Sequence, residues 1–168
     1  AFSLFSCKKE VLVKDNPNQI TSATYWKTES DVQAALAATY TLFRDVNIGY
    51  WGVRGIELSN GRGDDFFIRN DVADLYRLST FTNTPDNGPV NDFWNGSYRA
   101  IFRANQIIEN VGKVPGLSDA SKAAYVSEAK FLRGVNYFNL VINFGDVPLH
   151  LKLPVRKDDY FVAKSPED

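Results

Sequence analysis

Two long amphipathic segments separated by a short link constrain the fold of this 168-residue chain more than any other feature. Apolar residues recur every three or four positions from Pro89, a favoured first residue of a helix, to Gly112. The same pattern returns after Ser118 or Asp119, either of which can cap a helix, and runs to Gly145. Two long helices joined by so short a loop must lie antiparallel. The sequence therefore predicts an all-α fold built from tetratricopeptide-like helical hairpins with long loops.

An earlier helix is predicted from Ser30 to about Asn47. The Ser30 hydroxyl and Gln33 have the spacing of a capping box, in which two side chains satisfy backbone N–H groups of the first turn. Apolar side chains then form one stripe at helical spacing, which comprises Val32, Ala35, Leu36, Tyr40, Phe43 and Val46. Glycines punctuate the following residues and allow at most a short helix over residues 53–59. Residues 66–88 are predicted to form a loop, and long loops often carry function.

Charge and composition exclude several classes of function. Nineteen basic and twenty acidic residues give a net charge of -1, so the chain lacks the basic surplus of a nucleic-acid-binding protein. With one cysteine and one histidine, His150, an internal disulfide and a zinc site of the usual His/Cys type are out of reach, and no cofactor is expected. His150 lies in an apolar stretch, where a structural role is expected. The many aromatic residues can fill a core or line a site that stacks on sugar-like ligands, and composition does not decide between these roles.

The N-terminus carries a short motif around Cys7, the single cysteine. Residues 4–7 (LFSC) resemble the lipobox of bacterial lipoproteins, in which the cysteine thiol receives a diacylglycerol and becomes the mature N-terminus. The resemblance implies that residues 1–6 are the end of a signal peptide and that residues 7–24 are a lipidated N-terminus and tether. The alternative is a lone buried thiol that packs as a small hydrophobe. No apolar run after Cys7 approaches the ~18 residues of a membrane-spanning helix.

Three runs of residues in a fixed order resemble the SusD/RagB family. Residues 128–141 (EAKFLRGVNYFNLV) and then 143–149 (NFGDVPL) resemble the most recognisable motif of that family, and residues 93–108 resemble its preceding helix. The lipobox lies ahead of them. The resemblance implies that residues 25–168 are the N-terminal helical domain of a longer nutrient-binding lipoprotein. Residues 165–168 have the composition of a helix start, with serine as cap and proline next, so we expect the native chain to continue.

Members of this family resemble lids on the outer face of the bacterial outer membrane. The resemblance implies a lipid-anchored protein that binds a glycan or oligosaccharide, or else a peptide, and delivers it to a TonB-dependent, SusC-like transporter. No catalysis is expected, because Asp64 and Asp65 are adjacent and so poorly placed to flank one glycosidic bond. The alternative function is a tetratricopeptide-like scaffold that binds another protein and no nutrient. Stabilisation by a small ligand separates the two functions.

The candidate ligand-binding residues lie in and around the glycine-rich segment 60–69. Aromatic faces pack against the C–H faces of sugar rings, while carboxylates and guanidinium groups hydrogen-bond to hydroxyls. By resemblance, the acidic pair at positions 64 and 65 matches a loop close to the ligand in the family. The candidate set consists of Asp64, Asp65 and Arg69 as polar contacts and Tyr50, Trp51, Phe67 and Phe81 as aromatic platforms. The alternative is that the carboxylates cap a turn or pair with Arg62 and Arg69, and that the aromatic residues are core.

Other conspicuous side chains are predicted to be structural. Trp94 and Tyr98 continue an apolar stripe, so they are expected in the core rather than in a sugar-binding platform. Inter-helix or capping contacts are expected of Glu128, Arg133 and Asp146, which lie in the signature helix and the turn after it.

Overall fold

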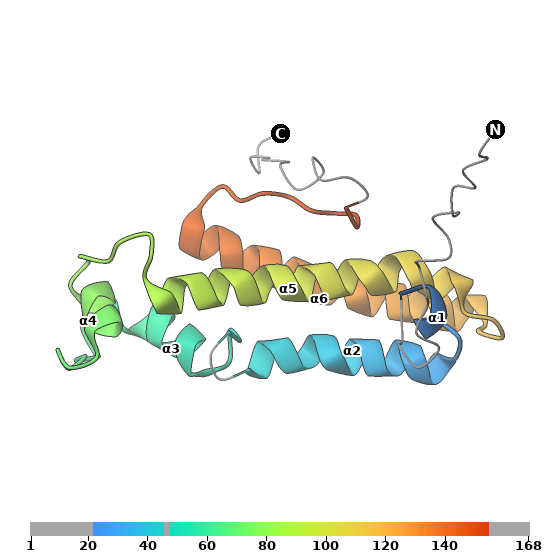
Figure 1. Cartoon of the computed structure of the whole chain (residues 1–168), viewed down its shortest axis with the longest axis horizontal. Coiled ribbons are helices and arrows are strands. Elements are labelled where there is room, and N and C mark those ends of the chain that lie inside the picture. The colour runs from blue at the N-terminus through green and yellow to red at the C-terminus, as the bar shows by residue number, and fades with distance from the viewer. Residues whose placement is uncertain (1–21, 46–47, 155–168) are drawn as a thin grey trace, which may run out of the picture.

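A computed structural model describes residues 22–45 and 48–154 of the chain (Figure 1). Every regular element in these two ranges is helical, which confirms the predicted all-α class. In chain order the elements are α1 (Ser22–Tyr25), α2 (Glu29–Arg44), α3 (Val53–Asn60), α4 (Ala73–Ser79), α5 (Gly88–Asn110), the 3₁₀ helix η2 (Val111–Lys113) and α6 (Asp119–Phe144). Cys7 and residues 165–168 lie outside the described residues, so what is predicted for them stays a prediction.

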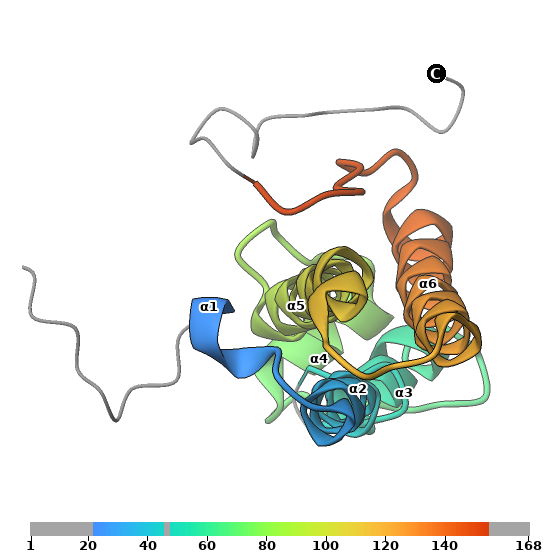
Figure 2. The same ribbon diagram turned by 90° about the vertical axis from the view of Figure 1, so that its right-hand side faces the viewer.

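Helix α5 is the centre of the fold. It runs antiparallel to α6, and η2 and a short turn join the two, so the predicted hairpin is confirmed (Figure 1). In the end-on view, α2 and α6 flank α5 on different sides, and the segment that follows α6 turns back across α5 (Figure 2). The short helices α3 and α4 contact α5 and lie beyond the C-terminal end of α2 (Figure 1).

Apolar side chains from the three long helices form a shared core cluster. Its buried members are Val32, Leu36 and Phe43 of α2, Ile107 of α5, Val111 and Val114 of the link, and Ala129 and Leu132 of α6. A second cluster joins α3, α4 and the start of α5 through Leu58, Leu75, Leu78 and Phe93. Full burial of one such aliphatic or aromatic side chain stabilises a fold by about 1.5–3 kcal/mol. The two clusters therefore hold α5 against the helices around it.

The capping box that opens α2 is not the predicted one. The N–H of Asp31 donates to Thr28 Oγ1 at 3.3 Å, and the N–H of Thr28 donates back to Asp31 Oδ2 at 2.7 Å. Hydrogen bonds from the Thr28 hydroxyl and backbone hold the pKa of Asp31 below its usual value. The prediction of Ser30 and Gln33 was wrong, because the earlier pair has the same spacing and adds a carboxylate at the positive end of the helix. Gln33 instead donates to the hydroxyl of Tyr125 on α6 at 3.2 Å.

The end of α2 and the predicted loop over residues 66–88 also differ from prediction. Helix α2 ends at Arg44 instead of continuing to Asn47, because the next residue leaves the helical conformation with φ -58° and ψ 130°. Residues 66–88 are not all loop, since they contain α4. Leu75 and Leu78 of α4 lie three positions apart and are 6% and 0% exposed. Their burial stabilises a helix too short to form on local propensity alone.

A close backbone approach explains Gly96 in α5. The carbonyl oxygen of Ile48 lies 2.2 Å from the position that a Cβ at Gly96 would occupy. A side chain at position 96 would collide with the backbone of the loop that follows α2. The loop can cross α5 here because glycine has no side chain.

Polar side chains of α5 and α6 hold the extended segment that follows α6. Asn105, which is 2% exposed, donates to the carbonyl of His150 and accepts a bond from the Arg133 guanidinium, both at 2.8 Å. The hydroxyl of Tyr137 accepts a bond from the His150 N–H at 2.6 Å. The hydroxyl of Tyr98 donates to a backbone carbonyl of the same segment at 2.8 Å. This polar clamp confirms the inter-helix contact predicted for Arg133 and the structural role predicted for His150.

Most of the remaining structural predictions are confirmed. Trp94 and Tyr98 pack together against the end of α6 in a third apolar cluster. Glu128 accepts a hydrogen bond from the Tyr40 hydroxyl at 2.8 Å, which links α6 to α2. Asp146 is exposed, and its side chain has no partner among the described residues, so the contact predicted for it was wrong.

Asn105→Ala removes the centre of the polar clamp. The Arg133 guanidinium and the carbonyl of His150 each lose a buried partner, so we expect the free energy of unfolding to fall by about 2–3 kcal/mol. Urea denaturation followed by circular dichroism measures the change. Asn95→Ala, on the exposed side of α5, is the matched control and should not lower the free energy of unfolding. Equal losses in the two variants would contradict the clamp.

Burial raises the pKa of Tyr98 and Tyr137 above the value of 10.0 for a free phenol, and the charge of Tyr137 adds to the rise at Tyr98. In the unfolded chain both phenols ionise near pH 10, whereas in the fold they keep their protons. The fold should therefore lose stability as the pH rises above about 10 and gain none from these groups below it. The measurement is the melting temperature as a function of pH. Below pH 10, Tyr98→Phe should melt at a lower temperature than the unmodified chain, because it lacks the hydrogen bond from the Tyr98 hydroxyl. Above pH 10, its melting temperature should fall less than that of the unmodified chain. A loss as steep as that of the unmodified chain would contradict this expectation.

Candidate functional site

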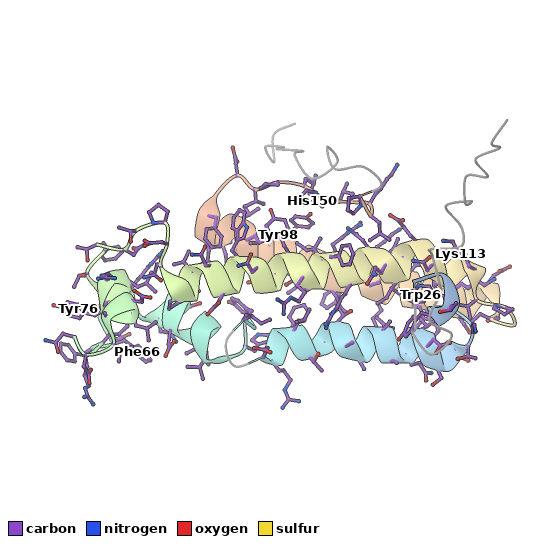
Figure 3. All side chains as sticks on the ribbon, in the orientation of Figure 1. Trp26, Phe66, Tyr76, Tyr98, Lys113 and His150 are labelled. Atoms are coloured by element: carbon purple, nitrogen blue, oxygen red, sulfur yellow. The ribbon has the colours of Figure 1, made fainter. Side chains whose placement is uncertain are left out.

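A concavity of about 310 Å³ lies at the end of the molecule formed by α3 and α4. Its lining consists of Phe67, Arg69, Asn70, Asp71 and Tyr76. The first four belong to the loop between α3 and α4, and the tyrosine belongs to α4. Figure 3 shows Phe66 and Tyr76 at this end, opposite the end that carries Trp26 and Lys113.

Local contacts hold the loop between α3 and α4 in place. At its start, the N–H of Gly61 donates at 2.8 Å to a carbonyl in the last turn of α3. A Cβ at Gly61 would lie 2.8 Å from Cδ1 of Ile68, whose side chain packs against the second core cluster. At the other end, the N–H of Val72 donates to the carbonyl of Arg69 at 3.2 Å. The side chain of Ile68 is half-buried against the second core cluster, whereas Phe67 and Arg69 on either side of it are exposed.

Phe67 and Tyr76 give the concavity two aromatic faces. Phe67 is 87% exposed, the largest fraction among the large hydrophobic side chains described, and Tyr76 is 38% exposed. A cluster of exposed apolar side chains is typical of a binding surface, because it is stabilised when a partner covers it. These rings offer platforms for the C–H face of a sugar ring or for another flat apolar group.

Polar side chains border the aromatic faces. Arg69 and Asp71 form an ion pair, and their side chains are 75% and 53% exposed. An exposed pair of this kind contributes at most about 1 kcal/mol, so ligand hydroxyls can bridge or replace it at little cost. Asn70 is also exposed and carries both a donor and an acceptor. The concavity therefore combines flat apolar surface with groups that hydrogen-bond in both senses.

The structure brings two of the sequence candidates together. Phe67 and Arg69 both line the concavity. Asp64 and Asp65 are exposed in the turn after α3 and lie outside its lining. Arg69 pairs with Asp71 rather than with either of these carboxylates. The acidic pair therefore has no part in the geometry of the concavity.

The other aromatic candidates lie elsewhere. Tyr50 is half-buried and packs on Phe93, with ring centroids 6.0 Å apart, as part of the second core cluster. Trp51 is 59% exposed, but its ring lies against the buried Phe43 at the end of α2, with centroids 5.2 Å apart. Phe81 follows α4 in a left-handed conformation with φ 55° and is 70% exposed outside the lining. Of the four predicted platforms, one lines the concavity.

Three lining residues were not among the sequence candidates: Asn70, Asp71 and Tyr76. Tyr76 had a usable signal. Leu75 and Leu78 are apolar at helical spacing, and a short helix built on them leaves the intervening tyrosine outside the core. Asn70 and Asp71 had no signal beyond being polar residues in a loop.

A second concavity, of about 200 Å³, lies between α5 and the extended segment after α6. Its lining consists of Tyr98, Ile101, Phe102, Asn105, His150, Lys152 and Pro154. Figure 3 shows Tyr98 and His150 in this region, and their rings meet edge to face with centroids 5.6 Å apart. Asn105 and Tyr98 already use their polar atoms to hold the segment. The first concavity is the stronger candidate, because its polar side chains are open to a ligand.

The concavity at the α4 end is suited to binding more than to hydrolysis. Its lining holds one carboxylate, that of Asp71, whereas glycoside hydrolysis uses a facing pair. Within residues 22–45 and 48–154, no group of three or more His, Cys, Asp and Glu side chains is placed to hold a metal ion. In the same part of the chain, no helix has the length and apolar content needed to cross a bilayer.

The antiparallel hairpin of α5 and α6, packed against α2, is of the tetratricopeptide-like type (Figure 1). Comparison with known families identifies the class of protein. The SusD-like family model, described as "Starch-binding associating with outer membrane", matches residues 14–164. The chain belongs to this family, which confirms the resemblance found in its sequence. The family points to a binding protein without catalytic activity.

The relatives and solved structures that resemble the chain are longer than it is. Two SusD-like proteins of Formosa agariphila are 29% and 30% identical to it over 99% and 93% of its length. The match covers 33% and 31% of those proteins, so the chain spans about a third of the curated relatives it matches.

Solved structures share its fold. A SusD superfamily protein from Bacteroides vulgatus is 35% identical, with a TM-score of 0.71 over 78% of this chain and 29% of that one. Surface glycan-binding protein A from Bacteroides uniformis is 23% identical, with a TM-score of 0.67 over 76% of this chain and 29% of that one. This second likeness shows the fold alone.

Proposed function

We propose that the chain is the N-terminal helical part of a cell-surface lipoprotein that binds a glycan and delivers it to a TonB-dependent transporter. The family description supports the glycan and the outer membrane. The concavity at the α4 end is the binding site in this proposal. Phe67 and Tyr76 supply the platforms, and Arg69, Asn70 and Asp71 supply the hydrogen bonds.

The observation that carries this proposal is the exposure of Phe67 beside three polar side chains. An isolated exposed phenylalanine needs no explanation, but Phe67 shares its concavity with Tyr76 and with donors and acceptors on Arg69, Asn70 and Asp71. A sugar ring presents an apolar C–H face and a rim of hydroxyls. This arrangement matches both features, because the ring face lies on the aromatic side chain while the hydroxyls meet the polar rim.

Delivery to a transporter requires that the ligand be released. A shallow, exposed site with a few hydrogen bonds suits this requirement, since each contact is weak and none encloses the ligand. Attachment to the membrane is proposed to occur through a lipid on Cys7, with the domain facing the exterior.

Glycan binding can be measured on the lipid-free chain by thermal shift and calorimetric titration. The probes are maltoheptaose, as a starch fragment, and a panel of other plant and host oligosaccharides and peptides. One saccharide class should raise the melting temperature in a dose-dependent way. Phe67→Ala and Tyr76→Ala should each weaken binding by about 3- to 10-fold, because each removes one stacking contact. Arg69→Ala should also weaken it by removing charged donors.

Phe102→Ala is the matched control. Phe102 is 42% exposed and lies in the second concavity, so its loss should leave glycan affinity unchanged. Loss of binding in Phe102→Ala but not in Phe67→Ala would move the site to the second concavity. A folded chain that responds to none of the saccharides or peptides would contradict nutrient binding and favour a protein scaffold.

A further inference from the structure

Phe81, just after α4, combines an exposed ring with a backbone conformation that disfavours phenylalanine. Its φ is 55°, and its side chain is 70% exposed. The other described residues with positive φ are two glycines, Gly116 and Gly145. In this left-handed conformation the Cβ of any residue other than glycine lies too close to the following carbonyl oxygen, which destabilises the fold. Glycine would therefore be the more stable residue at position 81.

The backbone hydrogen bonds at the end of α4 impose this conformation. The N–H of Thr82 donates to the carbonyl of Arg77 at 2.9 Å. The N–H of Phe81 donates to the carbonyl of Leu78 at 3.3 Å. These two bonds form a Schellman motif, which ends a helix through one left-handed residue that is usually glycine. The fold therefore needs the left-handed backbone at position 81, but the motif does not use the ring.

The ring of Phe81 has no role in the packing of the described residues. The second core cluster takes Leu75 and Leu78 from α4, and Phe81 belongs to none of the three apolar clusters. Within residues 22–45 and 48–154, no aromatic ring pairs with it. A strained backbone that carries an exposed side chain indicates a function outside the fold, because the strain brings no gain in packing.

Two threonine hydroxyls flank Phe81 in the sequence and leave a hydrogen-bond acceptor open. Thr80 Oγ1 donates to the carbonyl of Tyr76 at 3.1 Å and lies 2.8 Å from Thr82 Oγ1. Because a hydroxyl has one proton, Thr82 is the donor in the contact between the two threonines. The lone pairs of Thr82 Oγ1 can then accept a bond from a ligand hydroxyl. An apolar ring beside such an acceptor suits a sugar, which presents a C–H face and hydroxyls.

We propose that Phe81 is a further platform of the glycan site, on which a sugar residue beyond the concavity stacks. This inference rests on the proposed glycan binding at the α4 end. Tyr76, which lines the concavity, and Thr80 lie four positions apart and so on one side of α4. The rise of a helix places Phe81 about 7 Å beyond Tyr76 along the axis. A long oligosaccharide bound over Tyr76 therefore reaches Phe81, whereas a disaccharide in the concavity does not need it.

The test is Phe81→Gly, titrated with a short and a long saccharide. The probes are maltose and maltoheptaose, or the disaccharide and the longest oligomer of whichever saccharide class stabilises the chain. Glycine should raise the melting temperature by about 2–4 °C, because it adopts the left-handed conformation without strain. It should weaken binding of the long saccharide by about 3- to 10-fold, because one stacking contact is lost, and leave the affinity for the disaccharide unchanged. A gain in stability together with a loss of affinity is not expected of a structural ring.

Two control variants separate the ring from the backbone. Phe81→Tyr keeps an aromatic face in the same conformation, so it should keep the affinity for both saccharides and bring no rise in melting temperature. Phe131→Ala removes a ring that is 65% exposed in α6, away from the α4 end, and should leave both affinities unchanged.

Two results would overturn the role of Phe81. One is a Phe81→Gly chain that binds the long saccharide as tightly as the unmodified chain. The other is a lower melting temperature for Phe81→Gly, which would show that the ring packs in the fold. If Phe67→Ala weakens binding and Phe81→Gly does not, the glycan site stands and the inference about Phe81 fails alone. If the unmodified chain binds no saccharide, the proposed function fails and this inference fails with it.

Discussion

The antiparallel packing of α5 against α6 is the contact on which the rest of the structure depends. It brings Ile107 of α5 and Leu132 of α6 into one cluster with the apolar face of α2. It also sets Asn105 opposite Arg133, so that the chain leaving α6 is bonded back across both helices. At the other end of α5, Phe93 anchors α3 and α4 and so positions the loop that forms the aromatic concavity.

The sequence predicted the parts of the fold that rest on long, repeated signals. The helices from Pro89 and from Ser118 were found because apolar periodicity, caps and terminating glycines agree over more than twenty residues each. Helix α4 was missed, because a helix of seven residues has little periodicity and depends on tertiary burial for its stability. The cap of α2 was misplaced, since two pairs with capping-box spacing overlap and only the contacts decide between them.

The candidate site was predicted in part for a similar reason. A glycine-rich segment with mixed aromatic and polar residues marked the loop that carries the larger concavity described, and Phe67 and Arg69 both line it. Outside a periodic helix, the sequence does not separate exposed aromatic residues from buried ones, which is why Tyr50 was grouped with Phe67 although it packs on Phe93. The sequence also gave no prediction of the exposure of Phe131 and Phe138 in α6, whose side chains are each 65% exposed.

Glycan binding at the α4 end is tested most directly by chemical-shift mapping. The amides of the ¹⁵N-labelled chain would be followed while it is titrated with the oligosaccharide that stabilises it most. The largest shifts are expected at residues 66–71 and in α4 around Tyr76, with little change along α6. Shifts centred on Phe102 and His150 would contradict this site, and an absence of shifts at saturating saccharide would contradict glycan binding by this part of the protein.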